Sequence, residues 1–213
     1  MKVFLALCLC GWSIALPAQT KLQTFTSADG IFQFKHSNLL VHCTEQRHEE
    51  GNAGMWVPAD SCEAFTPVCD DPGRQGNSTT LVCFGYPKAK FKDYPTFEAA
   101  TFSVAHIKSA TTEKKCLDGE PDWVIDPRGS RKTVSINHER FTLFETDGVA
   151  TGHGFDGHVY RNFHRNTCYE VSIRIASTGS WVFGVPVKEL TRKDWNEVNG
   201  RLKQALDSFR FLK

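Results

Sequence analysis

Residues 132–178 read KTVSINHERFTLFETDGVATGHGFDGHVYRNFHRNTCYEVSIRIAST, and this stretch sets the expected architecture. Segments at 132–136, 140–155, 158–164 and 168–178 are rich in β-branched and aromatic residues, which favour strands. Turn residues separate these segments by short intervals. Consecutive strands with short connections pair antiparallel, so the stretch predicts an antiparallel meander.

Further strands are expected upstream of this meander. Segments 80–86 and 96–107 both predict strands, although the alanine pair in the second also permits a helix. Thr101, Ser103 and Val104 favour the strand there. Residues 31–43 predict two short strands joined by a turn at KHSN (35–38), and 109–117 predicts a short helix with a threonine cap and Glu113 in its first turn.

The C-terminal region predicts an amphipathic helix. Thr191 and Asp194 form a capping-box pattern, with Asp in place of the usual Glu. Apolar residues then recur at helical spacing: Trp195, Val198, Leu202 and Leu206. Ser208 should end the helix, and SFRF (208–211) predicts a short final strand. The expected fold class is therefore α+β.

The first 18 residues, MKVFLALCLCGWSIALPA, have the pattern of a secretory signal peptide. One lysine precedes an apolar run that is too short for a confident membrane span, and small residues follow it. Cleavage is expected after Ala18, with Ala15 as the alternative. It would leave residues 19–213 as a single domain with no integral membrane segment, in the periplasm or outside the cell.

The charge balance argues against a nucleic-acid-binding protein. The whole chain has 25 basic and 24 acidic residues, and loss of Lys2 with the leader makes the mature chain neutral. A neutral chain has no net field to attract nucleic acid or an anionic membrane. Basic clusters at 88–92 (KAKFK) and 128–132 (RGSRK) are interpreted as solvated surface.

The cysteines predict disulfide bonds. Six remain after the leader, at positions 43, 62, 69, 83, 116 and 168, which is the even number expected in an oxidising compartment. Residues 43–83 are dominated by turn-forming residue types, and so long an irregular loop needs a covalent tie. Of 15 possible connectivities, the expected set is Cys62–Cys69, Cys43–Cys83 and Cys116–Cys168.

Two segments resemble PsbP-like proteins, a family named after the extrinsic P subunit of photosystem II. They are TSADGIFQFKHSNLL (26–40) and LKQALDSFRF (202–211), and CYEVSIRIAST (168–178) looks like a late central strand of that family. The resemblance implies an α/β/α sandwich in which an N-terminal hairpin and a last helix and strand bracket an antiparallel sheet. It implies no function, because functional sites vary independently of the fold. More broadly, the chain looks like uncharacterised secreted bacterial proteins of this fold.

The sequence suggests one candidate site. GHGFDG (152–157) matches the dinucleotide motif G-x-G-x-x-G, but the segment after it predicts a strand instead of the required helix. We therefore interpret it as a glycine-rich hairpin turn. His153, His158 and Asp156 lie around this turn and offer imidazole and carboxylate ligands for zinc. The alternative is that these histidines are exposed strand residues that bind no metal.

No catalytic residue or cofactor site is recognisable in the sequence. HERFT (138–142) lacks the second histidine of H-E-x-x-H, and the G-x-S-x-G, phosphate-loop and C-x-x-C motifs are absent. The sequence favours a secreted, non-enzymatic binding or accessory domain for an unidentified protein or small-molecule ligand. The alternative is a metal-binding protein or hydrolase with a dispersed site near the 152–158 hairpin. A shallow surface with exposed aromatic residues would favour the binding domain. Histidines clustered with carboxylates in a deep pocket would favour the metal-binding protein or hydrolase.

Overall fold

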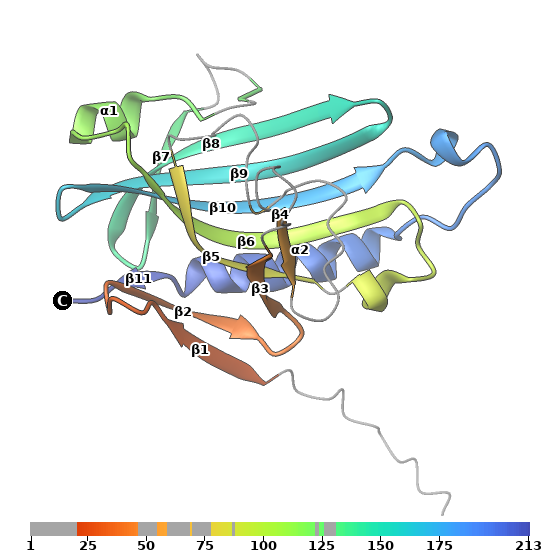
Figure 1. The fold of residues 1–213 in the computed structure, drawn as a ribbon, viewed down its shortest axis with the longest axis horizontal. Coiled ribbons are helices and arrows are strands. Elements are labelled where there is room, and N and C mark those ends of the chain that lie inside the picture. The colour runs from red at the N-terminus through yellow and green to blue at the C-terminus, as the bar shows by residue number, and fades with distance from the viewer. Residues whose placement is uncertain are drawn as a thin grey trace, which may run out of the picture.

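The computed structural model of the chain describes residues 21–46, 55–58, 69, 78–86, 88–121, 124–125 and 131–213. Its strands form two antiparallel sheets (Figure 1). The small sheet has the strand order β1 (Leu22–Thr26), β2 (Phe32–Ser37) and β11 (Arg210–Phe211). The large sheet has the order β4 (Met55–Pro58), β3 (Val41–Gln46), β5 (Ser78–Gly85), β6 (Phe97–Ile107), β10 (Thr167–Thr178), β9 (His153–His164), β8 (Glu139–Ala150) and β7 (Lys132–Ile136).

The predicted α+β class and the antiparallel meander β7–β8–β9–β10 are confirmed. A tight turn joins β8 to β9, with Thr151 and Gly152 both at positive φ. Strand β6 pairs with β10, so the segment at 96–107 is a strand and the helical alternative is wrong. The predicted short helix is α1 (Glu113–Asp118), which begins after its cap, Thr112.

The long helix α2 (Arg192–Asp207) packs on one face of the large sheet, with the small sheet beside it (Figure 1). The Thr191 side chain accepts a hydrogen bond from the Asp194 backbone, and Asp194 bonds back to the Thr191 N–H, so the capping box is present. Val198, Leu202 and Leu206 are buried as expected, whereas Trp195 is only half-buried.

The main core lies between α2, the small sheet and one face of the large sheet. Successive strand residues point to opposite faces, so alternate positions of β6 and β10 supply this core. Its members include Phe32, Phe34, Phe102, Val104, Val171, Ile173, Val198, Leu202 and Phe209. On the opposite face of the large sheet, α1 packs against β9 and β10.

Three strand assignments differ from the sequence-based expectation. The two strands expected within 31–43 are β2 and β3, but they belong to different sheets. The N-terminal hairpin instead consists of β2 and β1, which the sequence analysis missed. Part of the 43–83 segment, which was expected to be an irregular loop, forms strand β4, which pairs with β3.

The disulfide bonds correct two of the three expected pairs. Cys116 is joined to Cys168, as expected, and the bond ties α1 to β10. Cys69, however, is joined to Cys83, so the pairs Cys62–Cys69 and Cys43–Cys83 are wrong. The physical reason is that β3 and β5 place Cys43 opposite Cys83 in register while Cys69 also reaches this position, so three sulfur atoms gather there.

Residues 1–20, which contain the expected signal peptide, lie outside the described part of the chain, as does Cys62. Among the described residues, no helix has both the length and the hydropathy needed to cross a bilayer.

Candidate functional site

The structure separates the three residues expected to bind a metal. His153, Asp156 and His158 all lie on β9, and residues an odd number of positions apart on a strand point to opposite faces. Asp156 and His158 are opposite the core residues Ile175 and Ile173, on the face that α2 covers. His153 points to the other face, so the expected three-residue metal site is not formed.

His153 belongs to a buried polar cluster with Glu98 and Thr178. Its Nδ1 is hydrogen-bonded to Glu98 Oε1 and lies 3.2 Å from Thr178 Oγ1. The Thr178 hydroxyl also donates to Glu98 Oε1. Glu98 is 6% exposed, whereas the His153 side chain is 32% exposed. A buried carboxylate therefore fixes the orientation of a partly accessible imidazole.

Three strands bring this cluster together. Thr178 is the direct cross-strand neighbour of His153, because β10 and β9 pair in register at that position. Glu98 comes from β6, whose register with β10 shifts between Ala176 and Ser177. Glu98 and Thr178 lie 55 and 25 positions from His153 in the chain. No local sequence motif could have identified them.

Asp156 and His158 line a pocket between the large sheet and α2. The pocket has a volume of about 280 Å³. Its lining residues are Asp156, Gly157, His158, Ile173, Ile175, Ser177, Trp195 and Asn199. The two isoleucines belong to the core, whereas Asp156, His158 and Asn199 are exposed at the surface. The pocket thus combines apolar and aromatic surface with a few polar groups at its rim, as small-molecule sites usually do.

Helix α2 fixes one side of this pocket. Trp195 packs partly against the core, and this contact restrains its indole ring. The Asn199 side-chain amide donates to the Trp195 carbonyl oxygen at 2.9 Å, one helical turn away. The helical spacing predicts Trp195 on the buried face of the helix, and no sequence motif includes Asn199. The i, i+4 spacing of these two residues is the signal that could have linked them.

Charged and polar side chains also occupy the sheet face opposite α2. Arg161 Nε donates to Glu170 Oε2 at 2.8 Å, and Arg161 Nη1 donates to the Gly119 carbonyl oxygen at 2.6 Å. The hydroxyls of Ser103 and Ser172 lie 2.7 Å apart. These residues are buried, so their polar groups are costly unless they are hydrogen-bonded. We infer that these side chains stabilise the fold and do not form a binding site, since their polar atoms are hydrogen-bonded within the protein.

The cysteine cluster is the remaining candidate. Within the described part of the chain, one group of three potential metal ligands has its ligand atoms within 4.8 Å of one another, and it consists of Cys43, Cys69 and Cys83. Cys69 and Cys83 share a disulfide bond, and metal ligation by cysteine requires the thiolate. In this oxidised form the group therefore stabilises the β3–β5 region and is not a metal site.

Comparisons with known proteins give no family for this chain. No family model matches it, and no curated protein sequence matches it. A crystal structure of a protein from Bacteroides thetaiotaomicron overlaps 89% of the chain at 13% sequence identity and a TM-score of 0.42. The overlap covers 48% of that protein, so this chain spans about half its length. A similarity this low supports no argument about function.

Proposed function

We propose that this protein is an exported, non-enzymatic binding domain that holds a small molecule in the pocket between β9, β10 and α2. The observation that carries the proposal is the composition of the pocket. Trp195 forms an aromatic wall above apolar surface, and Asp156, His158 and Asn199 offer polar atoms at the rim. Two described disulfide bonds are compatible with an oxidising compartment outside the cytosol, which supports export.

The pocket suits recognition better than catalysis. Its polar residues are exposed at the rim, where they can contact a bound molecule. The pocket therefore supports binding, whereas the imidazole that a buried carboxylate orients, His153, lies on the other face of the sheet.

Ligand capture followed by mass spectrometry tests the proposal. The purified protein is incubated with small molecules from the medium of its native host, washed, and denatured to release what it retained. Asn199→Trp should block retention, because a large side chain at the rim of the pocket would fill it. Asn196→Trp is the matched control, since Asn196 is also exposed on α2 but does not line the pocket. Equal retention by both variants would place the ligand elsewhere.

The contact between Glu98 and His153 supports a second candidate function, general acid–base catalysis. A carboxylate on one imidazole nitrogen orients the ring so that the other nitrogen can exchange a proton with a substrate. His153→Gln should then abolish hydrolysis of an activated ester, whereas His158→Gln should not. Equal rates in the two variants would contradict this alternative.

A further inference from the structure

Of the seven large apolar side chains that are exposed in the described part of the chain, four lie at one end of the large sheet. They are Val149, beside the β8–β9 turn, and Trp181, Val182 and Val185, in the connection between β10 and α2. Their exposed fractions are 79%, 74%, 41% and 63%, respectively. We call these four residues the apolar tip. Single exposed apolar residues are ordinary, but a contiguous group of them marks an interaction surface.

The apolar tip is held in place by close backbone packing. Trp181 and Val182 belong to the short helix η3 (Ser180–Phe183), which sits against the β8–β9 turn. A Cβ atom at Gly152 would lie 2.3 Å from Val182 Cγ2, and one at Gly179 would lie 2.5 Å from Trp181 Nε1. Only glycine permits such close approach, so the two glycines allow the indole to rest on the backbone while staying exposed.

Hydrogen bonds and ring contacts join three loops at this end of the molecule. The Gly179 N–H donates to the Gly152 carbonyl oxygen at 2.8 Å. The Thr178 N–H donates to the Thr96 carbonyl oxygen, also at 2.8 Å. Lys188 Nζ lies 4.2 Å from the centre of the Tyr94 ring. These contacts tie the connection between β10 and α2 to the β8–β9 turn and to the loop that runs from the short helix η2 (Lys88–Phe91) to β6.

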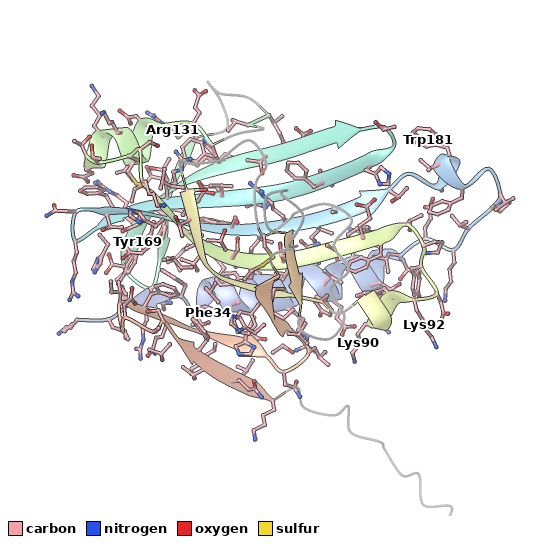
Figure 2. The ribbon with its side chains drawn as sticks, viewed as in Figure 1. Phe34, Lys90, Lys92, Arg131, Tyr169 and Trp181 are labelled. Atoms are coloured by element: carbon pink, nitrogen blue, oxygen red, sulfur yellow. A yellow bond between two sulfur atoms is a disulfide. The ribbon has the colours of Figure 1, made fainter. Side chains whose placement is uncertain are left out.

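Basic residues lie at the same end of the molecule as the apolar tip. Lys90 and Lys92 are exposed at the same end of the molecule as Trp181 (Figure 2). Lys188, Arg192 and Lys193 are exposed between the tip and the first turn of α2. Within segments 90–93 and 186–194, the five basic residues Lys90, Lys92, Lys188, Arg192 and Lys193 are accompanied by three carboxylates, Asp93, Glu189 and Asp194. The local charge is therefore positive, although the whole chain has a net charge of only +1.

We propose that this end of the molecule binds the surface of an anionic lipid bilayer. Tryptophan is favoured at the interface between lipid and water, where valines can enter the acyl region. Lysine and arginine at the same end of the molecule are attracted to anionic headgroups. The apolar and basic groups occupy one end of the protein, so they can contact a flat surface together.

A bilayer fits this surface better than a protein partner does. A stable protein interface buries about 800 Å² on each partner and involves roughly 20–30 residues of each. Four apolar side chains at the ends of loops supply only a small part of such an area. Shallow insertion into a bilayer needs no complementary partner surface, and the basic residues add attraction without a fixed geometry.

Vesicle co-sedimentation tests the proposal. The secreted protein without its leader (residues 19–213) is mixed with vesicles of phosphatidylcholine alone or of phosphatidylcholine with phosphatidylglycerol. Wild-type protein should sediment with the anionic vesicles and much less with the neutral ones. Trp181→Ala should weaken binding about tenfold or more, because it removes the largest apolar side chain of the tip, and Trp181→Phe should retain most of the binding. The double charge reversal K90E/K92E should weaken binding to anionic vesicles by about tenfold or more.

Matched control variants distinguish binding through this surface from non-specific binding of the protein to vesicles. Ile125→Ser removes an aliphatic side chain that is 55% exposed outside the apolar tip, and K108E/K114E reverses two exposed lysines elsewhere. Both controls should bind vesicles as the wild type does. Failure of the wild type to sediment with anionic vesicles would overturn the proposal. So would binding that Trp181→Ala leaves unchanged, or capture of a protein partner through this tip without any lipid binding.

Discussion

Three histidines in the described part of the chain have pKa values that are lowered by their surroundings, and they make folding sensitive to pH. Burial is the main cause for His36, His42 and His164. His36 is the most constrained, because its ring centre lies 4.3 Å from that of Phe84 and its Nδ1 is 3.0 Å from the Ser37 carbonyl oxygen. Protonation of His36 therefore works against the folded state.

The first prediction concerns stability in mild acid. Below about pH 6.5, the ordinary pKa of histidine, the unfolded chain binds protons that the folded His36 does not. Above about pH 6.5, His36 should not change the free energy of unfolding. Below it, the free energy of unfolding should fall as the pH drops toward the lowered pKa of folded His36. Urea unfolding from pH 7.5 to pH 5 measures this loss, which should be smaller in His36→Gln. Identical pH profiles of the variant and the wild type would contradict this role.

The second prediction concerns the buried ion pair between Arg161 and Glu170. Glu170→Gln leaves the Arg161 charge buried without a full countercharge, so it should cost roughly 3–5 kcal/mol of unfolding free energy. Glu113→Gln is the control, because Glu113 pairs with Arg140 at 3.5 Å on the exposed surface. Exposed pairs contribute about 0–1 kcal/mol. Similar losses in both variants, measured by urea unfolding, would show that the buried pair has no special role.

The candidate metal residues show how far the contacts of single residues could be predicted from the sequence. The sequence analysis placed His153 and His158 across a turn at 152–157, but the turn is made by Thr151 and Gly152. His153 and His158 therefore share one strand, and their odd separation puts them on opposite faces. An error of a few residues in the turn position changed which side chains could meet. Glu98 and Thr178 depend on pairing between distant strands, which no local pattern contains.

At the scale of elements, α2 is the part of the fold with the strongest local signals. Its cap, its helical spacing and its end at Ser208 were all predicted, since each depends on residues within one or two turns. The meander was predictable for the same reason. Strands β1 and β4 were missed, and β2 and β3 were not assigned to separate sheets, because those pairings depend on partners far along the chain.

The third prediction tests the packing of α2. Leu202 is fully buried among core residues, so Leu202→Ala should lower the free energy of unfolding by about 2–5 kcal/mol. Lys203→Ala is the control, since Lys203 faces solvent and pairs with Asp207 one turn later. That exposed pair should contribute about 0.5 kcal/mol or less. Chemical denaturation that gives equal losses for the two variants would mean that the buried face is assigned incorrectly.

At the scale of the whole molecule, the disulfide bonds connect elements that are distant in sequence. Non-reducing peptide mapping should find Cys69 linked to Cys83 and Cys116 linked to Cys168. The second bond spans 52 positions, so the double variant C116S/C168S should lose about 4 kcal/mol of stability through greater freedom of the unfolded chain. A peptide linking Cys43 to Cys83 would contradict the pairing seen here.

The wider relationships of the molecule remain predictions. The resemblance to PsbP-like proteins rests on the sequence segments 26–40, 168–178 and 202–211 alone. No family model matches the chain, so membership of that family is still a proposal. Cleavage of the leader after Ala18 likewise remains to be tested, and intact-mass analysis of the secreted protein would show where the mature chain begins.

The central claim is that the pocket beside α2 binds a small molecule, and thermal unfolding tests it most directly. A ligand that binds only the folded state stabilises it by about 2.7 kcal/mol at a hundred times its Kd. Small molecules released from the captured protein should therefore raise the Tm of the wild type and of Asn196→Trp but leave that of Asn199→Trp unchanged. An equal rise in Tm for Asn199→Trp, or no rise in the wild type, would contradict the claim.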